Sequence, residues 1–325
     1  MQSRAIVIER YGGPEVMRLD TVDVADPGPG EVRVLQRAVG LNFIDIYFRT
    51  GAYVAPLPHG IGMEGAGTIE AVGTGVTDLK AGDRVAYASG PLGAYSEHYL
   101  TPASRLVKLP SAISFEQGAA VMLKGLTVQY LFRQTYRLQG HETILFHAAA
   151  GGVGLIACQW ARALGVKLIG TVGSADKARL AKAHGAWEII NYSTENFVER
   201  VKALTGGEKV PVVYDGVGKD TWEGSLDCLQ PRGLMVSYGS ASGPVTGVNL
   251  AILAQKGSLY VTRPTLATHV LSHERLLASA EELFGLMTSG AIRVAIEQRY
   301  PLAQAGQAHA DLAARRTTGS CVLLP

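Results

Sequence analysis

The chain has 325 residues, of which 47% are hydrophobic and 18% charged, and its formal net charge is +2. This length favours two domains, each large enough for its own core. The near-neutral charge argues against both a nucleic-acid-binding stripe and a polybasic membrane surface. Three cysteines, Cys158, Cys228 and Cys321, have neither CxxC spacing nor a disulfide pattern, which indicates a reducing, cytoplasmic setting.

The first 120 residues or so are expected to be rich in β-strands, because glycine and proline turns separate short apolar runs. The runs include Val32–Val39, Gly67–Val72 and Arg84–Tyr87. A loop is expected after Val32–Val39. It carries an unusual density of side chains able to hydrogen-bond or stack: Asn42, Asp45, Tyr47 and Tyr53.

From about residue 122 strands and helices alternate, which predicts right-handed crossovers and a doubly wound parallel sheet. The expected strands are Thr143–Ala149, Val166–Val172, Trp187–Ile190, Val210–Tyr214, Gly233–Tyr238 and Ser258–Thr262. The helical segments between them include Lys177–His184, Thr194–Leu204 and Asp220–Leu229. After Thr262 we expect a helix near Arg275–Ser289 and a last strand near Ser320–Leu324, a tail that returns to the first domain.

The stretch from Glu142 to Gly165 has the order strand, glycine turn, helix. Its turn departs from the G-x-G-x-x-G fingerprint, because Ala149 stands at the first glycine position, before Gly151 and Gly154. In this context the backbone can approach a pyrophosphate at the helix N-terminus. Residues 143–161 contain no charge over about the length of a membrane span, but the strand-turn-helix order predicts a buried core instead.

The end of the second strand predicts the cofactor. An NAD site places an acid about 20 residues beyond the glycines, on the ribose 2′-hydroxyl. Here Gly173 and Ser174 follow the strand and Lys177 comes next, a set that suits a 2′-phosphate. Tyr192, at the end of the third strand, is expected beside the phosphate or the adenine. NADPH is therefore the predicted cofactor.

Six motifs resemble the zeta-crystallin-like quinone oxidoreductases of the medium-chain dehydrogenase/reductase superfamily, and the resemblance runs the whole length of the chain. The motifs are NFIDIY (42–47), LKGLTVQYL (123–131), FHAAAGGVGLIACQWA (146–161), LIGTVGS (168–174), VYDGVG (213–218) and LYVTRP (259–264). The resemblance implies a GroES-like domain at 1–121 and 263–325, a Rossmann-type NADPH-binding domain at 122–262, a cofactor in the cleft between them, and a homodimer.

The same resemblance assigns residues to the cofactor and the substrate. Asn42 and Tyr47 would lie near the nicotinamide, and Arg263 would border the substrate cavity; these three are the catalytic candidates. The other expected cofactor contacts are Thr127, Tyr130, Gly152, Val153, Gly173, Ser174, Lys177, Tyr192, Val217, Gly239, Pro264 and Arg316.

A catalytic metal is not expected. The superfamily's alcohol dehydrogenases bind zinc through a cysteine in the first loop and a histidine in a Gly-His-Glu sequence. Here Asn42 and Met63 occupy those positions, and His59 and Glu64 do not complete a zinc site.

Without a metal to polarise an acceptor, electron-poor quinones are the expected substrates. Tyr47 and Asn42 would orient the quinone carbonyl by hydrogen bonding. One-electron and two-electron reduction both remain open. An alternative is an NADPH-dependent reductase of α,β-unsaturated carbonyls, and a second is a non-catalytic NADPH-binding protein; RNA binding is disfavoured by the charge.

The last prediction from sequence concerns assembly. The run Ser258–Thr262 is the sixth strand of the sheet and should lie at an edge. It contains no charge and no proline to block pairing. Pairing of this edge with its own copy across a two-fold axis would form a homodimer.

Overall fold

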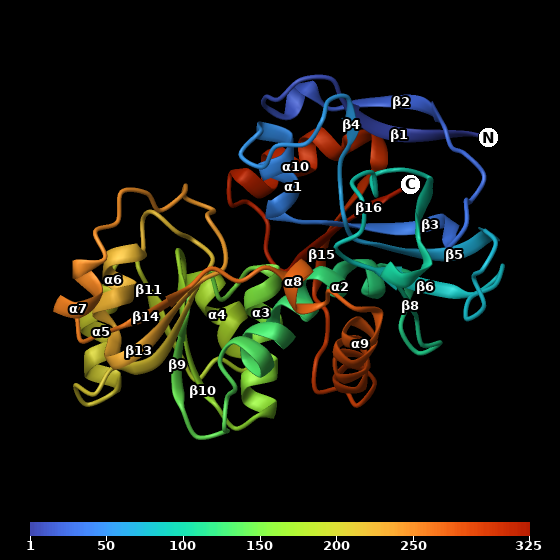
Figure 1. Cartoon of the computed structure of the whole chain (residues 1–325). Helices are drawn as coiled ribbons and strands as arrows, with labels where there is room; N and C mark the ends of the chain where they lie inside the picture. Colours follow the sequence, from blue (N-terminus) through green and yellow to red (C-terminus); the bar gives the residue numbers. More distant parts are fainter. The chain divides into compact units, whose positions relative to one another are not determined.

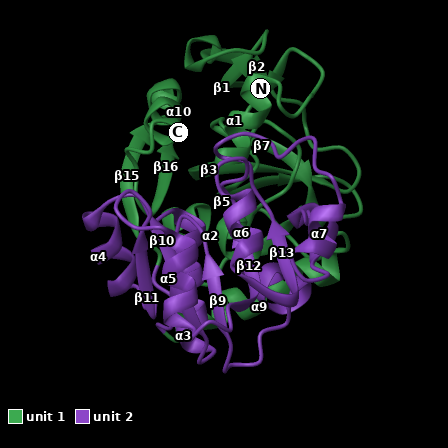
Figure 2. Ribbon diagram, turned by 90° about the vertical axis from the view of Figure 1, so that its left-hand side faces the viewer, with its two compact units in different colours: residues 1–126, 270–289, 294–325 green, residues 127–269, 290–293 purple.

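The computed structural model describes residues 1–325 and divides the chain into two compact units (Figure 2). Unit 1 is Met1–Leu126 with Val270–Ser289 and Val294–Pro325, and unit 2 is Thr127–His269 with Gly290–Arg293. The first division falls within one continuous helix, α2 (Phe115–Tyr130), which contains no proline to mark a boundary in the sequence.

Unit 2 is a six-stranded parallel sheet in the order β11-β10-β9-β12-β13-β14 (Figure 1). Its strands are β9 (Thr143–Phe146), β10 (Lys167–Val172), β11 (Glu188–Asn191), β12 (Val210–Asp215), β13 (Leu229–Ser237) and β14 (Tyr260–Thr262). Its helices are α3 (Gly152–Ala163), α4 (Ala175–Ala183), α5 (Phe197–Leu204), α6 (Trp222–Asp227), α7 (Ala251–Gln255) and α8 (Leu266–His269). This strand order is that of a dinucleotide-binding sheet, so the predicted Rossmann-type fold is confirmed.

Some elements begin later than expected, and for two of them local backbone chemistry gives the reason. The last strand starts at Tyr260 rather than Ser258, because Ser258 adopts a φ of +57°, which a strand does not accommodate. Helix α5 starts at Phe197 rather than Thr194, because the Asn196 side chain caps it by accepting backbone N–H bonds.

The uncharged stretch 143–161 is buried core of unit 2. Leu145 packs in one cluster with Ile169 and Val213 from the neighbouring strands, and Trp160 on α3 is fully buried. None of the helices is long and apolar enough to span a bilayer.

Unit 1 is built mainly from strands, as predicted. They are β1 (Gln2–Ile8), β2 (Arg18–Asp23), β3 (Glu31–Leu41), β4 (His59–Gly60), β5 (Gly65–Val72), β6 (Arg84–Tyr87), β7 (His98–Pro102), β8 (Leu106–Lys108), β15 (Ile296–Pro301) and β16 (Ser320–Leu324). Its remaining helices are α1 (Phe43–Thr50), α9 (His273–Thr288) and α10 (Ala305–Ala313). The tail returns as expected, since β16 pairs antiparallel with β3, with Val322 opposite Gly40.

The segment after β3 is a correction to the sequence prediction, because it forms helix α1 rather than a loop. Asn42 is the N-cap, and its backbone N–H donates to the Asp45 carboxylate at 2.8 Å. Gly51 ends the helix with a φ of +80°. Asn42 therefore lies at a fixed helix terminus.

Candidate functional site

The glycine turn after β9 leads directly into α3, which begins at Gly152. Gly151 is the N-cap and has no side chain to satisfy the first amides of the helix, so those amides are open to an anion. The third fingerprint glycine serves packing, because a Cβ on Gly154 would lie 2.4 Å from the Ala148 carbonyl oxygen. The predicted pair Gly152 and Val153 thus occupies the first turn of this helix.

Four residues predicted for the 2′-phosphate lie together at the carboxyl ends of β10 and β11. Ser174 caps α4, and its Oγ accepts the backbone N–H of Lys177 at 3.3 Å. The Tyr192 ring lies against Gly173, where a Cβ would come within 2.6 Å of the phenolic oxygen. The structure brings Gly173, Ser174, Lys177 and Tyr192 into one corner of unit 2.

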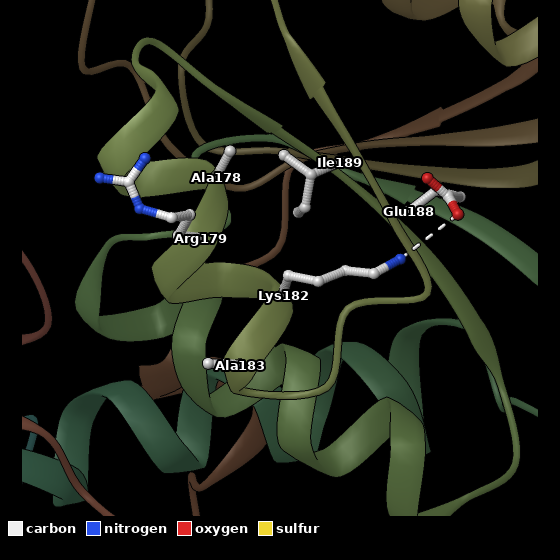
Figure 3. A pocket seen from close by; sticks show the side chains of 6 residues that line it. All are labelled: Ala178, Arg179, Lys182, Ala183, Glu188 and Ile189. Atoms are coloured by element: carbon white, nitrogen blue, oxygen red, sulfur yellow. Dashed lines mark hydrogen bonds and ion pairs between the residues drawn. The ribbon is translucent and has the colours of Figure 1, made fainter.

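No carboxylate is directed into this corner by the first turn of α4. Asp176 instead forms an exposed ion pair with Arg179, one turn further along. A shallow surface hollow lies farther along the helix, between α4 and β11, and Figure 3 shows Lys182 reaching across it to Glu188. The hollow contains none of the predicted site residues.

The loops after β12 and β13 carry Val217 and Gly239. The buried Asp215 carboxylate accepts the N–H groups of Val217 and Gly218 at 2.7 and 3.0 Å. Gly239 packs on the neighbouring loop so closely that a Cβ would lie 2.5 Å from the Gly216 carbonyl oxygen. Both loops are therefore fixed at the same edge of the sheet as the glycine turn.

Arg263 follows the edge strand β14 and is tied to the β13 loop. Its Nη1 donates to the carbonyl oxygens of Ser237 and Gly239 at 2.8 Å each. Its Nη2 donates to Ser240 Oγ at 3.2 Å. This fixes the backbone leading into Pro264 beside the loop that holds Gly239.

A buried hydrogen-bond chain beneath these loops was missed by the sequence reasoning. Ser225 Oγ donates to Asp215 Oδ2 at 2.9 Å, so it must accept from His147 Nε2, also at 2.9 Å. His147 Nδ1 is then the acceptor for the Thr171 hydroxyl at 2.9 Å. Burial lowers the pKa of His147, which suits this neutral tautomer. The chain links β10, β9 and β12 at their carboxyl ends.

Thr127 and Tyr130, predicted to line the cofactor site, lie on the part of α2 that belongs to unit 2. Both are almost fully buried. The Tyr130 ring stacks on His269, with centroids 4.4 Å apart and planes 19° apart.

In unit 1, Tyr47 lies on α1 in a cluster of aromatic rings. Its centroid is 5.9 Å from Phe43 and 5.2 Å from Tyr53. Arg316, predicted to add a cation for the cofactor, forms an ion pair with Asp311 in unit 1.

Asn42 is almost fully buried, and its side chain is hydrogen-bonded to a buried carboxylate. Its Nδ2 donates to Glu64 Oε2 at 2.7 Å, and Lys124 Nζ lies 3.1 Å from the same oxygen. The Leu123 N–H donates to Glu64 Oε1 at 2.7 Å. Lys124 was not among the predicted site residues, since the sequence showed it only as part of the motif 123–131.

A second buried polar chain lies under α1. Tyr95 Oη donates to Asp45 Oδ2 at 2.9 Å and lies 3.1 Å from His309 Nε2. Arg49 donates to His309 Nδ1 at 3.2 Å, so the neutral histidine carries its proton on Nε2. Burial raises the pKa of Asp45 to about 7 and lowers that of His309 to about 3.

Two family models match the chain. Residues 28–111 match the alcohol dehydrogenase GroES-like domain, and residues 152–289 match the zinc-binding dehydrogenase model. A GroES-like unit joined to a Rossmann-type sheet defines the medium-chain dehydrogenase/reductase superfamily.

Similar proteins narrow the class. A quinone oxidoreductase of Pseudomonas aeruginosa is 66% identical over 99% of this chain and 100% of the relative. The crystal structure of Escherichia coli quinone oxidoreductase complexed with NADPH has a TM-score of 0.98 at 57% identity, covering 99% of this chain and 100% of that one. A 2-haloacrylate reductase of Burkholderia sp is 42% identical over 99% of this chain and 98% of the relative. The chain belongs to the quinone oxidoreductase family.

The residues of this chain do not fit the zinc ion that the second model's name implies. Zinc prefers cysteine, histidine and carboxylate ligands around an open tetrahedral site. Here an ammonium group, Lys124 Nζ, already pairs with Glu64, and the Asn42 side-chain N–H donates a hydrogen bond to the same carboxylate oxygen. The positive charge of Lys124 opposes a second cation at this place.

Proposed function

We propose that the chain reduces quinones with NADPH. The observation that carries the proposal is the corner of unit 2 where Ser174 and Lys177 begin α4 beneath Tyr192, with Asp176 paired elsewhere. A hydroxyl, helix amides and an ammonium group suit a 2′-phosphate, whereas an acid would suit NAD. The NADPH complex of the Escherichia coli relative supports the same cofactor.

The proposed cofactor contacts follow the carboxyl edge of the sheet. Gly152 and Val153 would bind the pyrophosphate through the uncapped turn of α3. Gly173, Ser174, Lys177 and Tyr192 would hold the 2′-phosphate end. The remaining proposed contacts are Thr127, Tyr130, Val217, Gly239, Pro264 and Arg316.

We propose that the reaction takes place where Asn42, Tyr47 and Arg263 meet the nicotinamide. The family resemblance implies that this place is a cleft between the two domains. NADPH supplies the reducing equivalents when bound. Asn42 and Tyr47 would orient the acceptor by hydrogen bonds. The misfit of zinc supports a metal-free reaction, which favours acceptors that are already electron-poor, such as quinones.

A second candidate is the reduction of α,β-unsaturated carbonyls. The resemblance to a 2-haloacrylate reductase supports it, since that relative's name denotes an activated alkene. The two candidates are separated by steady-state turnover of NADPH with benzoquinone, naphthoquinone and an enone, each with and without a metal chelator. We expect the quinones to be preferred and the chelator to have no effect. Preferential enone turnover would replace the first function by the second, and chelator-sensitive activity would overturn the metal-free site.

We also propose a homodimer formed through the strand edge at 258–262, and a cytoplasmic location. The edge position of β14 supports the first. Three buried cysteines that form no disulfide support the second.

A further inference from the structure

The loops that follow β12 and β13 are joined to each other by hydrogen bonds and by close packing. We call them the β12 loop (216–219) and the β13 loop (238–243). The Val217 carbonyl oxygen accepts both the backbone N–H of Ser242 at 2.8 Å and its hydroxyl at 2.9 Å. A Cβ on Gly218 would lie 2.6 Å from a carbonyl oxygen of the β13 loop, so the two backbones are in direct contact. A movement of one loop therefore moves the other.

Arg263 supplies hydrogen-bond donors where β13 ends. The register between β13 and β14 stops at Val236, so Ser237 lies beyond the last residue paired with that neighbouring strand. Arg263 Nη1 donates to the carbonyl oxygens of Ser237 and Gly239, and its Nη2 donates to Ser240 Oγ. Because Nη1 carries two N–H groups, both of them are committed to this loop. The guanidinium thus fixes the start of the β13 loop.

The backbone groups of these loops are largely used within unit 2. The Val217 N–H donates to the Asp215 carboxylate, and both lone pairs of its carbonyl oxygen are taken by Ser242. The Gly239 N–H donates to the Asp215 carbonyl oxygen at 3.3 Å, and its own carbonyl oxygen accepts from Arg263. Where the loops stand, rather than new hydrogen bonds from Val217, therefore decides how well a cofactor fits against them.

We propose that Arg263 is a positioning residue for cofactor binding: its guanidinium fixes the β13 loop, and through it the β12 loop, in the arrangement that receives NADPH. This inference rests on the proposed function. Of the three residues proposed at the reaction, Arg263 then acts through the loops that it holds and not by contact with the acceptor.

The first variant is Arg263→Ala, which removes the guanidinium from an exposed position and leaves the core of unit 2 unchanged. If the released loops adopt the receptive arrangement about a tenth of the time, the dissociation constant of NADPH rises about 10-fold. A titration followed by the fluorescence of bound NADPH measures this rise without any turnover. At saturating NADPH the KM for benzoquinone should stay at its wild-type value, since no contact with the acceptor is lost.

Guanidinium ion provides a specific rescue of this variant. At about 50 mM, far below the molar concentrations that unfold proteins, it should occupy the vacated position and restore much of the NADPH affinity. Sodium chloride at the same concentration is the reference, because salt alone weakens phosphate binding. Arg232→Ala is the matched control: it removes another exposed arginine, from β13 itself, and should bind NADPH as the wild type does, with or without guanidinium.

The second variant loosens the same loops without changing Arg263. Ser242 Oγ donates to the Val217 carbonyl oxygen at 2.9 Å and accepts the Asp220 N–H at 3.1 Å. Ser242→Ala removes both bonds but keeps the backbone bond to Val217, so it should weaken NADPH binding less than Arg263→Ala does. Guanidinium should not restore this loss, because no guanidinium group has been removed.

Urea unfolding separates positioning from a merely structural role. A structural role would lower the free energy of unfolding of Arg263→Ala and leave the NADPH affinity of the folded protein unchanged, which would overturn the inference. A loss of NADPH affinity that guanidinium does not repair would also overturn it. A raised KM for benzoquinone with unchanged NADPH affinity would assign Arg263 to direct contact with the acceptor instead. Absence of NADPH binding by the wild type would refute the proposed function itself.

Discussion

At the scale of single residues, the first prediction concerns the proposed contact between Lys177 and the 2′-phosphate of NADPH. Lys177→Ala should weaken NADPH binding by about 1–2 kcal/mol, because one charge-assisted bond to phosphate is lost. NADH binding should be nearly unchanged, since that cofactor has no 2′-phosphate. Titration of both cofactors against the variant, followed by nucleotide fluorescence, measures the difference.

A matched control lies on the same helix. Lys182 also belongs to α4 but pairs with Glu188 across the surface hollow (Figure 3). Lys182→Ala should leave the affinities for both cofactors as they are in the wild type. An equal loss of NADPH and NADH affinity in Lys177→Ala would contradict the phosphate assignment.

The second prediction concerns how Asp45 makes the stability of the protein depend on pH. Its pKa is raised from 3.8 to about 7, chiefly by burial, so the folded state binds this proton more tightly than the unfolded state. Between about pH 4 and pH 7 the folded state holds the proton and the unfolded state does not. The contribution of Asp45 to the free energy of unfolding therefore falls as the pH rises through this window, by up to about 4 kcal/mol.

Asp45→Asn removes the titration while keeping an oxygen to accept from Asn42 N–H and Tyr95 Oη. Relative to the wild type, the variant should gain free energy of unfolding between pH 4 and pH 8. Urea unfolding at a series of pH values measures the gain. The exposed substitution Asp78→Asn is the control, and a constant difference between Asp45→Asn and wild type would disprove the raised pKa.

At the scale of elements, a buried chain of hydrogen bonds joins three strands at their carboxyl ends, where we propose that the cofactor binds. It runs through Thr171, His147, Ser225 and Asp215. Ser225→Ala breaks it and leaves the buried His147 Nε2 without its acceptor. We expect the free energy of unfolding to fall by about 1–3 kcal/mol. Thr194→Ala, which removes an exposed hydroxyl from the same unit, should cost much less in the same urea titration. Equally small losses of unfolding free energy in both variants would show that this hydrogen-bond chain contributes little to stability.

The elements themselves were largely predictable. Buried parallel strands are continuous apolar runs, as in Thr143–Phe146, and the glycine turn marks where the first one ends. Helix α1 was missed because its signals are an N-cap, an acid at N3 and a C-terminal glycine, which also suit a loop. Local patterns predict which residues are buried, but they do not predict which distant residues they meet.

The buried charges illustrate this limit. Lys124 meets Glu64 from 60 positions away, and Tyr95 meets His309 across 214 positions. The local sequence around these residues does not indicate which distant residue each of them contacts. The motifs identified Asn42 as a candidate, but only the fold identifies the carboxylate and the ammonium that hold it.

At the scale of the whole molecule, the outer edge of the unit 2 sheet, formed by β14, has no neighbouring strand. β14 pairs with β13 on one side only, and Tyr260 and Val261 are 54% and 40% exposed. An apolar edge strand without charge or proline favours association with another strand. Antiparallel pairing of two copies across a two-fold axis would satisfy the outer backbone groups and continue one sheet through both subunits.

Tyr260→Pro tests this assembly, because proline removes a backbone donor from the three-residue strand and disfavours further pairing. We expect the variant to sediment as a monomer and to unfold at a lower temperature than the wild-type dimer. Tyr260→Phe retains the backbone N–H and most of the apolar surface, so it should remain dimeric. A Tyr260→Pro protein that is folded and still sediments as a dimer would place the interface elsewhere, whereas a monomeric wild type would refute the dimer itself.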